Sequence, residues 1–82
     1  ANYAMNRLDL AERSARKVLR LDPLHRIPAA FLILADILEQ KQDLAGSIEQ
    51  LRNYLQILPN APSADRVRAR IRELEESLKK GE

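Results

Sequence analysis

The stretch that decides the fold is "LRLDP" at residues 19–23, which returns as "LQILP" at residues 55–59. Its prolines, Pro23 and Pro59, stand 36 residues apart. The same step carries apolar residues that follow the first motif onto apolar residues that follow the second: Phe31 onto Val67, Ala35 onto Ile71, and Leu38 onto Leu74. A period of this size that spans two helical segments is the signature of a helical repeat array.

Working outward from the first motif, apolar periodicity predicts a helix before it and another after it. The earlier helix covers residues 9–21, with Asp9 as its N-cap and Glu12 as the other half of a capping box. The later helix covers residues 28–40, and Pro28 suits its first turn because a proline there removes no hydrogen bond. The earlier helix places apolar residues on one side, whereas the later helix is apolar nearly all round, which predicts that it packs between its neighbours.

The second motif also lies between two predicted helices. A helix over residues 44–58 ends at Pro59, and a fourth helix begins at Ser63, a favoured N-cap residue. We expect the tail "KKGE" to be frayed. No segment favours a strand, so the fold class is all-α, and the short connections predict antiparallel neighbours. The apolar positions of the first, third and fourth helices are Leu8, Ala11, Ala15, Val18 and Leu19; Leu44, Ile48, Leu51, Leu55 and Leu58, with Tyr54 beside this face; and Ala64, Val67, Ile71, Leu74 and Leu78.

Composition limits the chain to one small domain. It has 82 residues, a formal charge of +2 and no cysteine, so disulfides and thiolate metal sites are excluded, while either redox compartment is compatible. The apolar run at residues 27–38 contains Pro28 and Asp36 and is shorter than the roughly 20 residues that a membrane span needs. The opening "ANYAMNRLDL" lacks the pattern of a signal peptide, and we expect a soluble fragment of a larger, bacterial protein.

On these residues the chain resembles the tetratricopeptide repeat (TPR) family, whose unit is an antiparallel helix pair of about 34 residues. Residues 28–59 look like one full repeat, residues 1–23 like part of an earlier repeat, mainly its second helix, and residues 63–80 like a capping helix. The family's first-helix positions fall on Phe31, Leu34, Ala35 and Leu38, and its second-helix positions on Ser47, Leu51, Tyr54 and Pro59, with Ala11, Ala15, Val18 and Pro23 matching in the partial repeat. The resemblance implies a right-handed solenoid fragment; the alternative is an unrelated four-helix bundle.

The chain departs from the family pattern at Asn2, where an aromatic residue is expected, in two extra residues in each inter-repeat loop, and at three residues of the third and fourth helices. Tyr54 stands where a small alanine is usual, Arg70 replaces a leucine, and Ile71 replaces a small residue that lets a partner helix approach closely. The loss of that small residue suggests that no further helix pair packs on residues 63–80. The segment is therefore expected to act as a solvating cap, which helical arrays need at their ends.

The resemblance also implies a binding surface, because the first helix of each pair lines a concave groove in this family. The corresponding residues are Ala29, Leu32, Ile33, Asp36, Glu39 and Gln40, a largely apolar set in which Asp36 could pair with a basic residue of a bound peptide. Two alternatives stay open. Leu32 and Ile33 could be covered by the fourth helix, by upstream repeats or by a second copy, and Asp36 could bond Arg70 or Arg72. A clamp for a terminal carboxylate is excluded, since Asp36 would repel it.

Other chemistry has little support in the sequence. His25 is the one histidine and lies in a loop, and the serines have no base within helical reach, so we expect no enzymatic activity, no metal and no cofactor. The basic side chains of Arg13, Arg16, Lys17 and Arg20 share one outer face, either as a solvated surface or as a patch for an acidic protein or nucleic acid. The expected function is a non-enzymatic protein–protein interaction or scaffold module. The alternatives are a spacer or homodimerisation element and, third, an Arg-mediated nucleic-acid binder.

Overall fold

The computed structural model describes residues 2–22 and 27–81, with side chains from residue 7 onward. These residues form four helices and no strand, which confirms the all-α expectation. The helices are α1 (Asn2–Leu21), α2 (Ala29–Gln40), α3 (Leu44–Ile57) and α4 (Ala64–Lys80).

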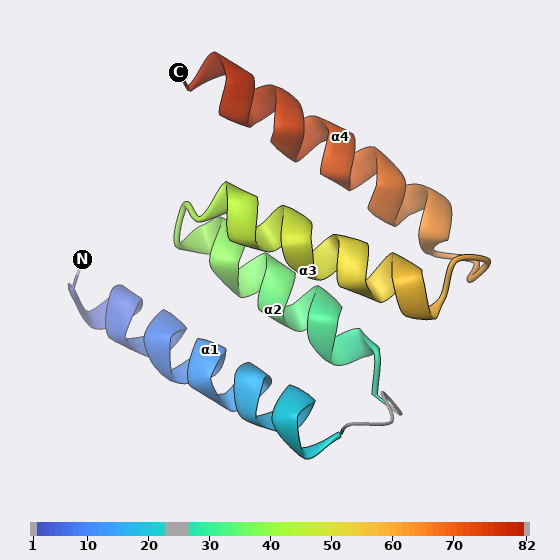
Figure 1. Ribbon diagram of the computed structural model, residues 1–82. Helices are drawn as coiled ribbons and strands as arrows, with labels where there is room; N and C mark the ends of the chain where they lie inside the picture. The colour runs from blue at the N-terminus through green and yellow to red at the C-terminus, as the bar shows by residue number, and fades with distance from the viewer. Residues whose placement is uncertain (1, 23–26, 82) are drawn as a thin grey trace.

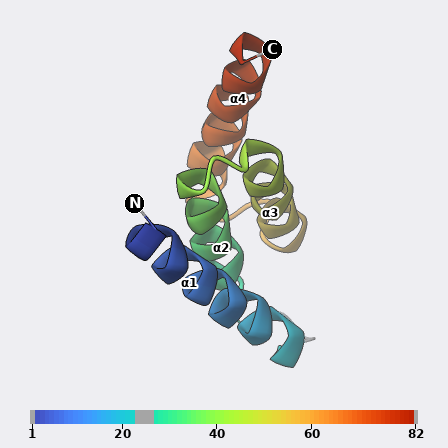
Figure 2. The ribbon, with the colours of Figure 1, turned by 90° about the vertical axis from the view of Figure 1, so that its left-hand side faces the viewer.

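The helices form an open row in which each one packs on the next in sequence. Consecutive helices run antiparallel, so both ends of the chain lie on the same side of the row (Figure 1). Within the described residues, no two Cα atoms within 8 Å of each other join α1 to α3 or α4, or α2 to α4. Figure 2 shows α1 and α4 at opposite ends of this row. The molecule measures 37 × 32 × 16 Å, and it is not a closed bundle in which the first and last helices would meet.

The core consists of two clusters that share α2. The larger cluster joins α2, α3 and α4 and contains Phe31, Ala35, Ile48, Leu51, Tyr54, Val67, Ile71 and Leu74. The smaller cluster joins α1 and α2 and contains Ala15, Leu34, Ile37 and Leu38. Because α2 is covered on two sides, it needs apolar residues around most of its circumference, which accounts for the run "FLILADIL". Each large aliphatic side chain buried in this way stabilises the fold by about 1.5–3 kcal/mol.

Small residues allow α2 and α3 to approach closely. Ala35 is 2% exposed and Ser47 is 1% exposed, and the Ser47 hydroxyl donates a hydrogen bond of 2.8 Å to the Ala35 carbonyl oxygen. Farther along α3, the bulky Tyr54 is also buried, and its hydroxyl lies 2.7 Å from the Ser63 hydroxyl, next to the start of α4. Both buried hydroxyl groups therefore have a partner, as the low dielectric of a core requires.

The link between α2 and α3 is a tight turn. Gln42 has a φ of 69°, in the left-handed region that glycine prefers. The Gln42 and Asp43 N–H groups donate to the carbonyl oxygens of Glu39 and Leu38 at 2.9 and 2.8 Å, the pattern of a Schellman motif. Asp43 then caps α3, since its carboxylate accepts a 3.1 Å hydrogen bond from the N–H of Gly46. This turn sets the antiparallel pairing of the two central helices.

Two predicted helix ends are wrong. The first helix begins at Asn2 rather than at Asp9, so Asp9 and Glu12 lie within α1 and cannot cap it. The residues before Asp9 contain no glycine or proline that would stop a helix, and the D-x-x-E pattern also occurs inside helices. At the other end of the chain, α4 continues through Lys79 and Lys80, whose charges favour a helix C-terminus, so these two residues are not a frayed tail.

Ser63 does take the predicted N-cap position of α4, but its side chain makes no capping hydrogen bond. Its hydroxyl pairs instead with Tyr54. Asp65 lies in the first turn of α4 as expected. The predicted end of the first helix is also close to the observed one, although Pro23 itself lies outside the described residues.

Candidate functional site

Exposed apolar side chains gather at one end of the row. Among the described residues, the large apolar side chains that stay exposed belong to α1, to α2 or to the segment that leads into α2, and they are Leu10, Val18, Leu21, Ile27 and Ile33. On α1, the spacing of Leu10, Val18 and Leu21 places them on one side of the helix. Soluble proteins rarely leave a contiguous apolar surface uncovered without a functional reason. This end of the row is therefore the first candidate for a binding surface.

A groove between α1 and α2 lies in this surface. It encloses about 440 Å³, and Ser14 is the one polar residue in a lining made of Ala11, Ser14, Ala15, Val18, Ile27, Ala30, Ile33 and Ile37. Val18 was predicted to face the core with Ala15, but it is 38% exposed and lines the groove instead. No helix in the described part of the chain covers this side of α1, which is why Val18 stays open.

The predicted groove residues divide into two groups on α2. Ala29, Ile33, Asp36 and Gln40 are exposed and share one side of the helix, and of these Ile33 lines the groove. The Asp36 carboxylate accepts a 3.0 Å hydrogen bond from the side-chain amide of Gln40. This polar pair lies on the turn beyond Ile33, so it forms a rim beside the apolar groove.

The other two predicted residues lie on the adjoining flank of α2, toward the larger core cluster and Arg70. Leu32 is partly buried against the larger core cluster, and Glu39 forms an ion pair with Arg70 of α4. Arg70 also pairs with Glu73, at 2.8 Å. Arg70 therefore takes Glu39 rather than Asp36 as its acidic partner on α2. The structure thus brings Ile33, Ala29, Asp36 and Gln40 to the groove side and turns Leu32 and Glu39 away from it.

Sequence reasoning missed the part of the groove that α1, Ile27, Ala30 and Ile37 supply. Ala30 and Ile37 lie three residues before and four residues after Ile33, the spacing of one helix face, and this spacing could have identified them. Ser14 carries no such signal, because a lone serine between Arg13 and Ala15 is ordinary on an exposed helix. Ile27 precedes α2 and could not be placed by periodicity.

A cluster of charged side chains ties α1 to the end of α2. The Lys41 ammonium lies 2.6 Å from the Asp9 carboxylate and 2.7 Å from the Glu12 carboxylate, and Glu12 also pairs with Arg16 at 2.9 Å. The hydrogen bond from Lys41, followed by the one from Arg16, holds the pKa of Glu12 below its ordinary value. The hydrogen bonds with Asp9 and then Glu12 raise the pKa of Lys41. These charges favour each other's ionised forms and fix the register of α1 on α2.

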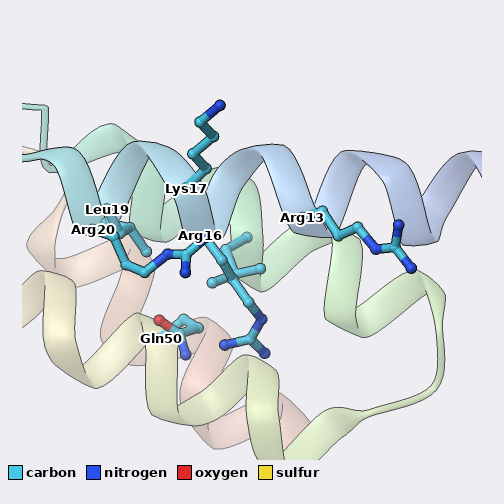
Figure 3. A pocket seen from close by; sticks show the side chains of 7 residues that line it. Arg13, Arg16, Lys17, Leu19, Arg20 and Gln50 are labelled. Atoms are coloured by element: carbon cyan, nitrogen blue, oxygen red, sulfur yellow. The ribbon is translucent and has the colours of Figure 1, made fainter.

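A second hollow, on the other side of α1, is basic. It encloses about 560 Å³ between α1 and α3 and is lined by Arg13, Arg16, Lys17, Leu19, Arg20, Leu34 and Gln50. In Figure 3 the side chains of Arg16 and Arg20 extend from α1 toward Gln50, whereas Lys17 points away from it. The grouping of these cations on one outer face was predicted, but Gln50 was missed. Its distance from Ser47 and Tyr54 places it on the inward side of α3, which was the available signal.

Other kinds of site are not formed by the described residues. They contain no group of His, Cys, Asp and Glu residues arranged to hold a metal ion. No helix built from them is both long and apolar enough to cross a membrane. His25, the residue considered for catalysis, lies outside the described part of the chain. No family model, curated protein or solved structure matches this chain.

Proposed function

We propose that this chain is a non-enzymatic protein–protein interaction module of tetratricopeptide type that binds an amphipathic helix of a partner protein in the groove between α1 and α2. The observation that carries the proposal is that, among the described residues, the exposed large apolar side chains all lie at this end of the row. A helix laid into an apolar groove is a recurrent mode of peptide recognition.

The internal repeat supports a helix as the occupant. Within the chain, α3 contacts α2 through the Ser47 hydroxyl, which donates to the Ala35 carbonyl oxygen, and Leu51 and Tyr54 of α3 are buried in the cluster that α2 shares with α3 and α4. The 36-residue step carries these positions back onto Ala11, Ala15 and Val18, which line the groove on α1. The side of α1 that faces the groove therefore corresponds to the side of α3 that holds α2. A partner helix would sit on α1 as α2 sits on α3.

The same comparison specifies the chemistry of the partner. The residues that α2 directs toward α3 include Phe31 and Ala35, a large and a small side chain one turn apart. A matching ligand has large and small apolar residues at this spacing. Asp36 is exposed on the rim, so a Lys or Arg beside the apolar stripe of the ligand would add a rim ion pair.

The open arrangement of the helices also supports the repeat-type reading. Each helix packs on its neighbour in sequence, which is how a solenoid differs from a closed bundle. The outer side of α4 is charged, with Arg66, Arg68, Arg72, Glu73 and Glu76 all exposed. Such a surface suits the solvated end of an array, and it leaves the opposite end, at α1 and α2, as the side that binds.

The test uses a synthetic peptide with the sequence of residues 28–40, extended with Lys residues for solubility, because this segment is the helix that α3 already holds. We expect its addition to shift the NMR amide signals of groove residues such as Ser14 and Ile33. The variant Ile33→Glu should weaken binding by about tenfold or more, because the new carboxylate would be buried without a partner. Ala69→Glu, on the exposed side of α4, is the matched control and should leave binding unchanged.

Three results would reject the proposal. If the peptide shifts signals throughout α4, or if both variants weaken binding equally, the groove is not the site. If sedimentation equilibrium instead shows a dimer that Ile33→Glu dissociates, the groove is covered by a second copy, and the alternative of a homodimerisation element replaces that of a partner-binding module.

A further inference from the structure

The basic hollow between α1 and α3 has features that the groove does not explain. It lies on the other side of α1, and of the described residues that line it four are cationic and none is acidic. Among the described residues, no acid pairs with Arg13, Lys17 or Arg20, and Arg16 shares Glu12 with Lys41. Like charges three and four residues apart repel one another along a helix, so this arrangement opposes the stability of α1. An anion bound in the hollow would relieve that repulsion.

Gln50 gives the hollow a polar group on its α3 side. Its side chain is 8% exposed, and no hydrogen bond to it is formed by the described residues. It nevertheless lines the hollow, with Arg16 and Arg20 directed toward it from α1 (Figure 3). No fully buried side-chain nitrogen or oxygen of the described residues lacks a hydrogen-bond partner, so the Gln50 amide is accessible from the hollow and can bond a group placed between the two helices. The NH₂ of Gln50 and the guanidinium groups are all donors, so the matching group is an acceptor with negative charge.

The apolar part of the lining selects among the possible anions. Leu19 and Leu34 border the same hollow as the cations, and none of the described residues that line it is an aromatic on which a base could stack. A carboxylate suits the planar fork of arginine, and an aliphatic side chain next to it would contact the leucines. We propose that this hollow binds an acidic peptide segment, with Arg16, Arg20 and Gln50 donating hydrogen bonds to a carboxylate and with Leu19 and Leu34 contacting a neighbouring aliphatic side chain.

The test measures binding of a short fluorescein-labelled peptide of alternating Glu and Leu residues by fluorescence anisotropy. Arg20→Glu should weaken binding by about tenfold or more, because a charge-assisted hydrogen bond is lost and repulsion replaces it. Arg66→Glu is the matched control, since it makes the same change of charge on the exposed side of α4. It should change the affinity for the peptide by less than about twofold, because site-specific contacts rather than net charge decide binding. Gln50→Met keeps the packing volume and removes the amide, and it should also weaken binding.

Further binding measurements test this hollow against other sites and other ligands. The Ile33→Glu variant alters the apolar groove on the other side of α1 and should bind this peptide as the wild type does, so the two proposals can fail separately. The same peptide with Gln in place of Glu should not bind. Equal losses in Arg20→Glu and Arg66→Glu, effective competition by inorganic phosphate alone, tighter binding of single-stranded DNA, or no binding at all would each overturn the proposal.

Discussion

Leu34→Ala tests the contact that holds α1 on α2. Leu34 is 0% exposed and belongs to the smaller core cluster, where its neighbour on α1 is the short Ala15. A buried Leu→Ala change costs about 2–5 kcal/mol, and the cost rises with the cavity that remains. Ala15 cannot fill that cavity, whereas the adjacent Leu19 can partly move into it. We therefore expect a loss of about 3 kcal/mol, near the middle of this range.

That loss is large for a domain of 82 residues, whose free energy of unfolding should be about 4–12 kcal/mol at the usual stability per residue. The assay is urea unfolding followed by far-ultraviolet circular dichroism, with linear extrapolation to water. Ile33→Ala is the matched control, because Ile33 is the next residue along α2 and is 57% exposed. It should change the free energy of unfolding by less than about 0.5 kcal/mol at low protein concentration, as expected at an exposed site.

A Leu34→Ala protein within about 0.5 kcal/mol of the wild type would contradict the packing of α1 on α2, since a surface change is usually that small. A large, concentration-dependent loss in Ile33→Ala would mean that a second copy covers Ile33. The two variants differ by one position on the same helix turn, so a difference in helix propensity cannot account for a gap of this size.

Four further predictions follow from single contacts. The pKa of Glu12 is lowered in the fold, so its contribution to the free energy of unfolding is present at neutral pH and is lost as the pH falls through that lowered pKa. In Glu12→Gln the free energy of unfolding should therefore fall less steeply with decreasing pH in this range than in the wild type, and an unchanged slope would contradict the Lys41 contact. Asp43→Ala should cost about 1 kcal/mol in urea unfolding through loss of the α3 cap. Gln42→Gly should raise stability by about 0.5–1 kcal/mol, since glycine adopts the left-handed turn without strain, and a lower thermal midpoint would refute this. Ser47→Leu should destabilise by about 1–3 kcal/mol through overpacking against α2, measured in the same assay.

The periodic part of the fold could be predicted from the sequence, because it depends on which residues must be buried. The pairs Phe31 and Val67, and Ala35 and Ile71, related by the 36-residue step, are all buried in the larger cluster. Local signals were less reliable. Asp9 has the residue type of a cap, yet α1 passes through it, since nothing before it ends the helix. A residue type that favours helix caps can also occur inside a helix, so its presence does not exclude a longer helix.

The candidate site was predictable only in part, because its geometry depends on how neighbouring helices are rotated. Arg70 pairs with Glu39 rather than Asp36 because of how α4 is placed relative to α2. The sequence alone does not show that placement. The exposed side of Ile33 was foreseen, but the opposite wall of the groove comes from α1. Gln50 became a candidate only after the space between α1 and α3 was known.

The sequential packing of the helices has a consequence for cooperativity. Ala15 is the one described α1 residue in either buried cluster, whereas α2, α3 and α4 share the larger cluster. Regions with few buried apolar contacts open at a lower free energy than the rest of a domain. The amide hydrogens of α1 should therefore exchange with solvent before those of α2 and α3. Since α1 forms a wall of both the groove and the basic hollow, a ligand at either place would slow that exchange, and its binding would be coupled to the folding of a single helix.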